Sequence, residues 1–289
     1  MFRNLSPGTI GIRGLGLAEA IALARETGFE AVDLPIREAA QLAERRGIEH
    51  VRALFADAGV RPGSWGLPFD WRDESAWRAG VAELGGLAEV GRQLGCTRVF
   101  TWVPPGSDER AMDANRRWHV ERFRPIAEAL GPSGCRIGLE FIGPKTLRDQ
   151  FAHPFVHSME GMLELIDQIG APNVGLLVDA YHVYTSHGSN EDVARLRPEQ
   201  VVVVHVNDAP AGIPVDEQED RVRCLPVATG VIDLAGFMGA LRRIGYDGPV
   251  TVEPFDQQLN ELGASDPKAA ARATAESLAR LWQVAGLAG

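Results

Sequence analysis

Two apolar runs that each end in ionisable residues limit the folds open to this chain more than any other feature. Residues 174–178 are followed by the polar segment 179–182, and residues 201–204 are followed by the polar segment 205–208. Continuous aliphatic runs of this length are typical of strands buried on both faces of a parallel sheet. Ionisable groups at the ends of such strands are costly unless they pair or bind a ligand. Because parallel α/β proteins bind ligands at the carboxyl ends of their strands, these two segments are the first candidate for a functional site.

The rest of the chain alternates in the same way between strand and helix patterns. We expect strands at residues 9–12, 31–34, within 60–68, and at 98–102, 136–141, 174–178, 201–204 and 249–254. We expect helices at residues 17–27, 39–58, 74–94, 115–130, 158–169, 191–196, 231–244 and 267–284. Five helices end at a glycine, the residue that most easily adopts the left-handed conformation of a helix C-cap: Gly28, Gly59, Gly95, Gly170 and Gly245.

Eight strands that alternate with helices predict a single (β/α)8 TIM barrel over residues 1–289. A doubly wound open sheet is the alternative. That fold places a Gly-x-Gly-x-x-Gly turn after its first strand, and the glycines of residues 11–16 have a different spacing.

Composition excludes several classes of protein. The net charge of −10 argues against binding to a phosphate backbone, so we expect no nucleic-acid partner. No apolar run approaches the length of a membrane span, and the first residues lack the apolar region of a signal peptide. Three scattered cysteines, Cys96, Cys135 and Cys224, have no metal-binding spacing and are expected to be reduced thiols. These features predict a cytoplasmic protein without a membrane partner.

Four successive predicted strands present an ionisable side chain where each one ends. The four residues are Glu140, Asp179, His205 and Glu253. Strands that follow one another in the sequence are neighbours around a barrel, so these side chains are expected to converge. Three carboxylates and an imidazole repel or compete unless a cation binds them, and this mixed oxygen and nitrogen set suits Mn²⁺ or Mg²⁺, with Co²⁺ or Zn²⁺ as alternatives. Taken singly, Glu140 could cap a loop, His205 could be a core histidine, and Asp179 could be a helix N-cap.

Several segments of the second half carry a resemblance to a known family. They are residues 138–140, 177–182, 204–208, 223–226 with 230–233, and 246–253. With these segments the chain resembles the xylose-isomerase-like TIM-barrel superfamily. Within it, the chain is similar to the branch of sugar isomerases and epimerases that includes ketose 3-epimerases, hydroxypyruvate isomerases and inosose dehydratases. The resemblance runs over the whole chain and implies a homo-oligomer, either a dimer or a tetramer.

The resemblance also implies roles for particular residues. Glu140, Asp179, His205 and Glu253 would hold one divalent metal ion, and Glu140 and Glu253 would double as the acid/base pair. His182 and Arg223 would contact oxygens of a sugar or keto-polyol substrate. Removal of a proton beside a carbonyl creates an enediolate, which a metal stabilises while two carboxylates move the proton. The structural alternatives are a surface arginine for Arg223 and an orienting role on a metal ligand for His182.

The loops around these motifs depart from the family pattern. Residues 143–146 lack the second glutamate that ketose 3-epimerases usually carry shortly after the first, and residues 227–230 replace a common Gly-Glu-Gly. Lys145 is a candidate substrate contact or a solvated loop lysine. Trp65 and Trp102 are candidates for the apolar wall of a sugar site or for packing within the barrel. The acidic loop 209–220 could cover the mouth of the barrel or meet another subunit.

Two other functions compete with an isomerase or epimerase. A metal-dependent lyase or dehydratase acting on a keto-sugar or keto-inositol would use the same four ligands but expel a hydroxyl or glycosyl oxygen. The superfamily also contains endonucleases for abasic DNA, which need extra histidines from early strands. This chain has Trp65 and Trp102 there and only 7 His in all, which disfavours that activity. A non-catalytic binding protein would leave the carboxylate cluster unexplained.

Overall fold

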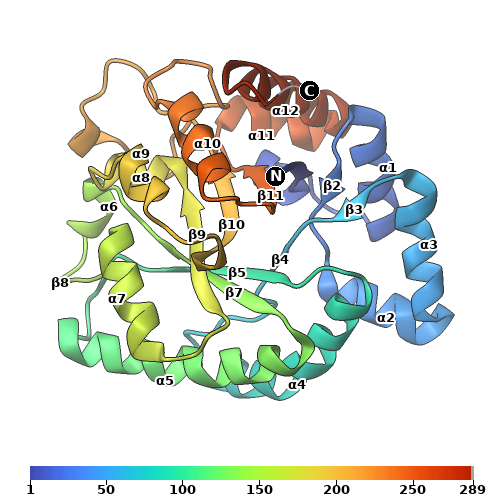
Figure 1. Ribbon diagram of the computed structural model, residues 1–289, viewed down its shortest axis with the longest axis horizontal. Helices are drawn as coiled ribbons and strands as arrows, with labels where there is room; N and C mark the ends of the chain where they lie inside the picture. The colour runs from blue at the N-terminus through green and yellow to red at the C-terminus, as the bar shows by residue number, and fades with distance from the viewer. Residues whose placement is uncertain (288–289) are drawn as a thin grey trace.

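The strands form one parallel sheet in which neighbours in the sequence are also neighbours in space. The structure is a computed structural model, and it describes residues 1–287 (Figure 1). The strands of the sheet run in the order β3-β2-β1-β11-β10-β9-β7-β5-β4. Their bounds are β1 Phe2–Leu5, β2 Ala31–Val32, β3 Arg61–Pro62, β4 Trp65–Gly66, β5 Arg98–Val103, β7 Arg136–Phe141, β9 Val174–Asp179, β10 Val201–Val206 and β11 Pro249–Val252. A separate antiparallel pair is formed by β6 (Gly106–Ser107) and β8 (His153–Pro154).

The third strand position is shared by two short strands that complete the TIM barrel. β3 pairs with β2, and β4 pairs with β5, so the segment 61–66 joins the two sides of the sheet. Between them the chain passes Gly63, where a Cβ atom would lie 1.9 Å from the Asn4 side chain. Only glycine allows this close approach. The predicted α/β barrel of eight strand positions is therefore confirmed, with its third position divided in two.

Helices cover the outside of the sheet (Figure 1). Their bounds are α1 Leu17–Thr27, α2 Ile36–Arg46, α3 Ile48–Ala58, α4 Glu74–Gln93, α5 Met112–Leu130, α6 Lys145–Arg148, α7 Met159–Ile169, α8 Ala180–Thr185, α9 Asn190–Ala194, α10 Leu234–Arg243, α11 Gln257–Ser265 and α12 Pro267–Val284. The five predicted C-cap glycines all have positive φ, between 65° at Gly59 and 81° at Gly28. Among residues 1–287, no helix is long and apolar enough to cross a membrane.

The prediction of the first strand was wrong. Residues 2–5 form β1, whereas Pro7–Ile10 is a 3₁₀ helix that ends at Gly11 with φ of 80°. The segment 2–5 lacks a continuous apolar run because Arg3 and Asn4 interrupt it. Asn4 is nevertheless buried, and its Nδ2 donates to Asp33 Oδ1 (2.7 Å) and Thr251 Oγ1 (2.9 Å).

One helical prediction also needed correction, and three helices were not predicted. The single helix expected at residues 39–58 is broken into α2 and α3 at Gly47, whose φ of 85° and ψ of 150° are not helical. The helices α6, α8 and α11 were not predicted. The residues of α8 are almost all buried, so they lack the one-sided apolar pattern that marks a surface helix.

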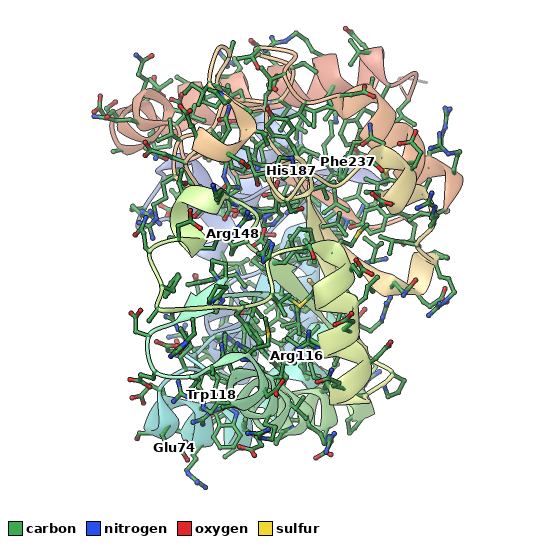
Figure 2. All side chains as sticks on the ribbon, turned by 90° about the vertical axis from the view of Figure 1, so that its left-hand side faces the viewer. Glu74, Arg116, Trp118, Arg148, His187 and Phe237 are labelled. Carbon is green, nitrogen blue, oxygen red and sulfur yellow. The ribbon has the colours of Figure 1, made fainter. Side chains whose placement is uncertain are left out.

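The core strands are buried on both faces, as the sequence predicts. Every residue of β9 and β10 is buried. On the outside, α5 is anchored to α4 because Arg122 forms an ion pair with Glu74 and lies over the rings of Trp77 (4.4 Å) and Trp118 (5.2 Å). Figure 2 shows Glu74 and Trp118 close together at this edge of the molecule. This anchoring matters for the site because α5 forms one wall of its cavity.

Candidate metal centre

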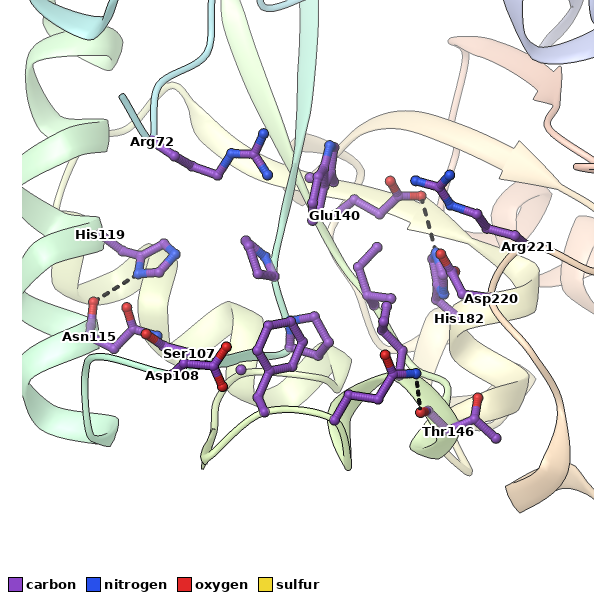
Figure 3. A pocket seen from close by; sticks show the side chains of 18 of the residues that line it. Arg72, Ser107, Asp108, Asn115, His119, Glu140, Thr146, His182, Asp220 and Arg221 are labelled. Carbon is purple, nitrogen blue, oxygen red and sulfur yellow. Dashed lines mark hydrogen bonds and ion pairs between the residues drawn. The ribbon is translucent and has the colours of Figure 1, made fainter. Parts of the chain in front are cut away.

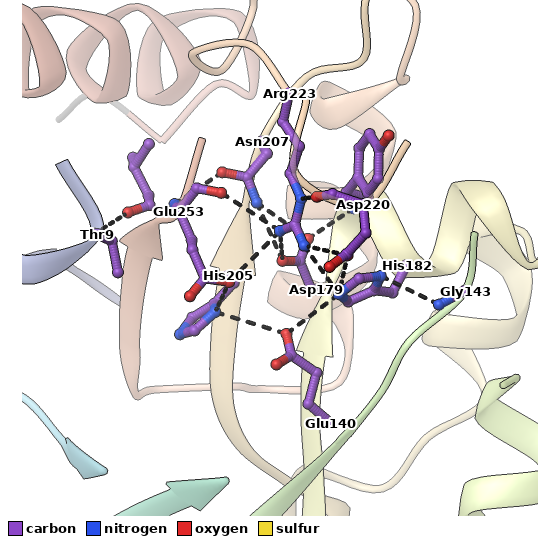
Figure 4. A network of polar contacts seen from close by, with 12 residues as sticks. Thr9, Glu140, Gly143, Asp179, His182, His205, Asn207, Asp220, Arg223 and Glu253 are labelled. Atoms are coloured by element: carbon purple, nitrogen blue, oxygen red, sulfur yellow. Dashed lines mark hydrogen bonds and ion pairs between the residues drawn. The ribbon is translucent and has the colours of Figure 1, made fainter. Parts of the chain in front are cut away.

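The four ionisable residues at the strand ends lie together. Glu140 is in β7, Asp179 ends β9, His205 is in β10, and Glu253 directly follows β11. One ligand atom from each lies within 4.8 Å of the others (Figure 4). The register aligns them, since His205 is paired with Asp179 across the two strands. The convergence expected from the strand order is thus present in the structure.

The donor atoms of this cluster fit a divalent cation. Glu140 Oε1 and His205 Nδ1 are buried and have no hydrogen-bond partner among residues 1–287. His205 Nδ1 lies 3.7 Å from Glu140 Oε1 and 3.5 Å from Glu253 Oε2. Buried polar atoms are rarely left unpaired unless they serve a ligand or an ion. Carboxylate oxygens and one imidazole nitrogen match the ligands of Mn²⁺, Mg²⁺, Co²⁺ and Zn²⁺.

Burial and mutual repulsion shift the pKa values of the cluster strongly. Burial, followed by the charge of Glu253, raises the pKa of Glu140 well above its ordinary value. Burial also raises the pKa of Asp179, although Arg223 opposes this. For His205, burial favours a lower pKa, but Glu253, Glu140 and Asp179 outweigh it and raise the pKa to about 9. The cluster therefore holds more negative charge than the protein alone stabilises, and a bound cation would relieve it.

Asn207, which our sequence analysis did not single out, holds two members of the cluster in place. Its Nδ2 donates to Asp179 Oδ2 (3.1 Å), and its Oδ1 accepts a hydrogen bond from the Glu253 backbone N–H (2.8 Å). Asp179 also accepts from the Tyr181 N–H (2.7 Å), so it caps α8 as well. Asn207 lies in the polar segment after β10, which is the only signal in the sequence that points to it.

Arg223 is buried against the cluster rather than exposed on a loop. Its guanidinium is 2.9 Å from Asp179 Oδ2, 2.9 Å from Asp220 Oδ1 and 3.5 Å from Glu253 Oε2. The rings of Tyr181 and Phe255 both lie 4.7 Å from its guanidinium carbon. The acids outweigh the effect of burial, so the pKa of Arg223 is raised and the charge is permanent.

Replacing Arg223 with methionine is expected to lower the free energy of unfolding by about 3 kcal/mol, because it leaves buried carboxylates without their counter-charge. Chemical denaturation in the presence of a chelator measures this. Arg195→Met is the matched control, since the Arg195 side chain is 77% exposed and its pair with Asp192 lies on the surface. Its expected effect is within about 0.5 kcal/mol. Equal effects of the two substitutions would contradict the prediction.

His182 is buried between two hydrogen-bond donors. The Gly143 backbone N–H faces His182 Nδ1 (3.2 Å), and Arg223 Nη2 faces Nε2 (3.2 Å). Burial lowers the pKa of His182 well below its ordinary value, which keeps the ring neutral. Nε2 faces Glu140 Oε1 at 3.7 Å and Asp220 Oδ1 at 3.8 Å, both too far for a hydrogen bond. Since a neutral imidazole has one acceptor nitrogen, it accepts from either Gly143 or Arg223 but not from both at once.

A cavity of about 1030 Å³ opens beside the cluster (Figure 3). Glu140, His182, Arg223, Glu253 and Trp102 line it, and Trp102 is 42% exposed. Glu219 and Asp220 from the predicted acidic loop also line it. That loop is tied to the site because Tyr181 Oη donates to the carbonyl of Glu219 (2.6 Å) and Thr146 Oγ1 donates to that of Gln218 (2.7 Å).

Two predicted substrate contacts do not line this cavity. Trp65 is buried on the outer side of the sheet, where its Nε1 donates to Cys96 O (3.0 Å) and lies 3.3 Å from the position of a Cβ on Gly91 of α4. It therefore packs between sheet and helix. Lys145 is 45% exposed and lies 4.0 Å from Asp149 on α6, as a solvated lysine would.

His119 is a cavity residue that our sequence analysis missed. It lines the wall formed by α5 and is almost wholly buried, at 1% exposure. Burial, with a smaller effect from Arg110, lowers its pKa to about 4. No sequence signal marks His119, because it lies in the middle of a helix and only tertiary packing brings it to the cavity.

This shifted pKa of His119 predicts a pH-dependent stability. Below about pH 6.5 the unfolded chain binds a proton at His119, whereas the folded protein does not until about pH 4. Stability is therefore lost as the pH falls through this window. The wild type should lose about 3 kcal/mol more than His119→Phe between pH 7 and pH 4, as measured by urea denaturation. Parallel pH profiles would contradict this.

Comparisons with known proteins place the chain in a family. A family model described as xylose isomerase-like TIM barrel matches residues 21–281. The chain belongs to this family. Its homologues in the xylose isomerase-like family include inosose isomerases, ketose 3-epimerases and 3-dehydroshikimate dehydratases. One is an inosose isomerase from Bacillus velezensis, 26% identical over 242 residues that cover 83% of this chain and 80% of that protein.

Solved structures of xylose isomerase-like proteins have the same fold. A xylose isomerase domain protein from Alicyclobacillus acidocaldarius superposes with a TM-score of 0.86 at 35% identity, covering 99% of both chains. The protein IOLI with a bound zinc atom superposes with a TM-score of 0.75 at 18% identity, covering 99% of this chain and 98% of that one. The second likeness concerns the fold alone.

Proposed function

We propose that this protein is a divalent-metal-dependent sugar isomerase or epimerase that transfers a proton through an enediolate intermediate. The observation that carries the proposal is the convergence of Glu140, Asp179, His205 and Glu253 within 4.8 Å beside a large cavity. The names of the homologues, inosose isomerase and ketose 3-epimerase, support this class of reaction. Mn²⁺ or Mg²⁺ is the proposed ion, with Co²⁺ and Zn²⁺ as alternatives, and the zinc atom in IOLI supports a metal at such a site.

When bound, the cation supplies a Lewis acid that stabilises negative charge on neighbouring carbonyl and hydroxyl oxygens. Glu140 and Glu253 are the proposed acid/base pair. Both line the cavity beside the proposed ion, so two carboxylates are available to remove a proton from the substrate and to return it.

Other residues of the cavity would bind and orient the substrate. His182 is proposed to contact a substrate oxygen, because it lines the cavity and its Nε2 lies 3.7 Å from Glu140 Oε1 of the cluster. The charge of Arg223 would stabilise negative charge that develops on substrate oxygens. The exposed ring of Trp102 would stack on the C–H face of a sugar. The placement of Lys145 and Trp65 removes them from this proposed set.

A lyase or dehydratase on a keto-sugar or keto-inositol is the second candidate. The observation that favours it is the presence of 3-dehydroshikimate dehydratases among the homologues, one of them 31% identical over 138 residues. That match covers 47% of this chain and 20% of the dehydratase. In such a reaction the same pair of carboxylates would remove the proton, and a hydroxyl would leave the neighbouring carbon.

Metal removal tests the proposal. Protein treated with a chelator should lose its activity, and each of Mn²⁺, Mg²⁺, Co²⁺ and Zn²⁺ is then added back singly. Elemental analysis should find one ion per chain in the active protein. Full activity in protein shown to be metal-free would overturn the proposal.

A further inference from the structure

The cavity continues well beyond the carboxylate–histidine cluster. Figure 3 shows Glu140 and His182 on one side of it and Asn115 and His119 of α5 on the other. Its volume of about 1030 Å³ reaches the upper end of the ~300–1,000 Å³ typical of ligand pockets. A single sugar ring bound at the cluster would leave the α5 side of the cavity unfilled.

His119 presents an unused hydrogen-bond acceptor on the α5 side. Its Nδ1 is 2.8 Å from the backbone carbonyl oxygen of Asn115, and a carbonyl only accepts, so Nδ1 carries the ring proton. Nε2 is left with a lone pair and has no partner among residues 1–287. A buried acceptor without a partner is unfavourable by itself, so this nitrogen needs a donor from outside the chain.

Aromatic rings surround this nitrogen and fix the imidazole. Phe155 stacks on His119 at 4.6 Å between ring centroids, and Trp118 meets it edge-on at 4.9 Å. Trp71 approaches at 5.3 Å, and its own Nε1 already donates to Thr101 Oγ1. The ring is therefore held with Nε2 directed into the cavity, as Figure 3 shows for the imidazole.

The charges on this side of the cavity favour a neutral ligand. Arg72 is paired with Asp70 at 2.8 Å, and Arg110 is paired with Glu109 at 3.2 Å. An acid beside each guanidinium balances its charge, and Asp108 on the same wall adds a negative charge, so these groups supply no net positive charge for a phosphate or carboxylate. The site therefore suits a neutral molecule whose hydroxyl groups donate hydrogen bonds and whose C–H face packs on aromatic rings. A sugar or polyol has both features.

We propose that the α5 side of the cavity is a second subsite, which binds a sugar ring or polyol attached to the part of the substrate held at the cluster. In this subsite His119 Nε2 accepts a hydrogen bond from a hydroxyl group of the bound sugar or polyol. The substrate is then a glycoside or disaccharide rather than a free monosaccharide. This assignment rests on the proposed function, since it takes the cluster as the place where the reacting ring binds.

Calorimetric titration of the metal-loaded protein tests the subsite without turnover. The probes are maltose, cellobiose, lactose and sucrose, compared with methyl glycosides of their component sugars. At least one disaccharide should bind about 10-fold more tightly than the methyl glycosides, and His119→Phe should remove that advantage while leaving methyl glycoside affinity unchanged. No advantage for any disaccharide, or an advantage that survives in His119→Phe, would overturn the subsite.

Nitrogen NMR of ¹⁵N-histidine-labelled protein measures whether a hydrogen bond forms at His119 Nε2. A purely structural role of His119 would not change this resonance when a ligand binds. The Nε2 resonance of His119 should shift when the tighter disaccharide binds and stay in place with methyl glycosides. His119→Gln keeps an acceptor oxygen and should restore part of the affinity. His50→Phe, on α3 and outside the cavity, is the matched control.

The two proposals fail separately. Loss of the disaccharide advantage with intact metal-dependent proton transfer would refute only the subsite. Retention of the advantage and of the NMR shift without proton transfer would refute only the proposed chemistry.

Discussion

Replacing Glu253 with glutamine should reduce turnover by about 10³-fold, the middle of the range for the loss of a general acid or base. The amide keeps the size of the side chain and one oxygen ligand but can neither remove nor return a proton at neutral pH. Glu253 lies at the mouth of the barrel directly after β11, and its backbone N–H is held by Asn207. The fold should therefore be kept, and turnover of metal-loaded protein measures the effect.

The control must show that turnover falls because proton transfer is lost and not because the metal ion is lost. Elemental analysis of Glu253→Gln should still find one ion per chain at saturating metal. Glu261→Gln makes the same change on the exposed face of α11, where the Glu261 carboxylate accepts a hydrogen bond from Gln257, and should leave turnover unchanged. Substantial residual turnover in metal-loaded Glu253→Gln would remove Glu253 from the acid/base role.

Replacing Asp179 with asparagine should weaken metal binding by more than the ~10–100-fold that loss of an outer partner of a ligand costs. Asp179 is fully buried and points its carboxylate at the cluster, so the substitution removes a whole negative charge from the coordination set. Arg223 keeps its pairs with Asp220 and Glu253, which preserves the surrounding structure.

Competition titration with a metal-binding dye measures this loss. Asp167→Asn is the matched control because Asp167 is exposed on α7 and belongs neither to the cluster nor to the lining of the cavity. Unchanged metal affinity in Asp179→Asn would mean that the ion binds elsewhere in the protein.

Strand positions and the cluster could be predicted because they share one signal. An apolar run such as 201–204 is typical of a buried strand, and His205 follows it at the carboxyl end, where parallel α/β proteins bind their ligands. The strand order then brings Glu140, Asp179 and Glu253 to the same place. No contact between them had to be known.

The features that the sequence did not determine depended on tertiary contacts. β1 was not predicted because Asn4 is a polar residue, and only the folded structure shows that it is buried and hydrogen-bonded to Asp33. Trp65 and Trp102 looked equivalent at two strand ends, yet one faces α4 and the other faces the cavity. His119 reaches the cavity only because α4 and α5 pack together, and nothing local to residue 119 indicates this.

The most direct test of the central claim is deuterium incorporation measured by NMR. Metal-loaded protein is incubated in D₂O with a panel of ketoses, aldoses, keto-inositols and their glycosides, beside chelator-treated protein. We expect deuterium to enter a carbon next to the carbonyl of at least one of these compounds, and we expect this exchange only when metal is present. Absence of exchange with every compound, or exchange that is equally fast without metal, would contradict it.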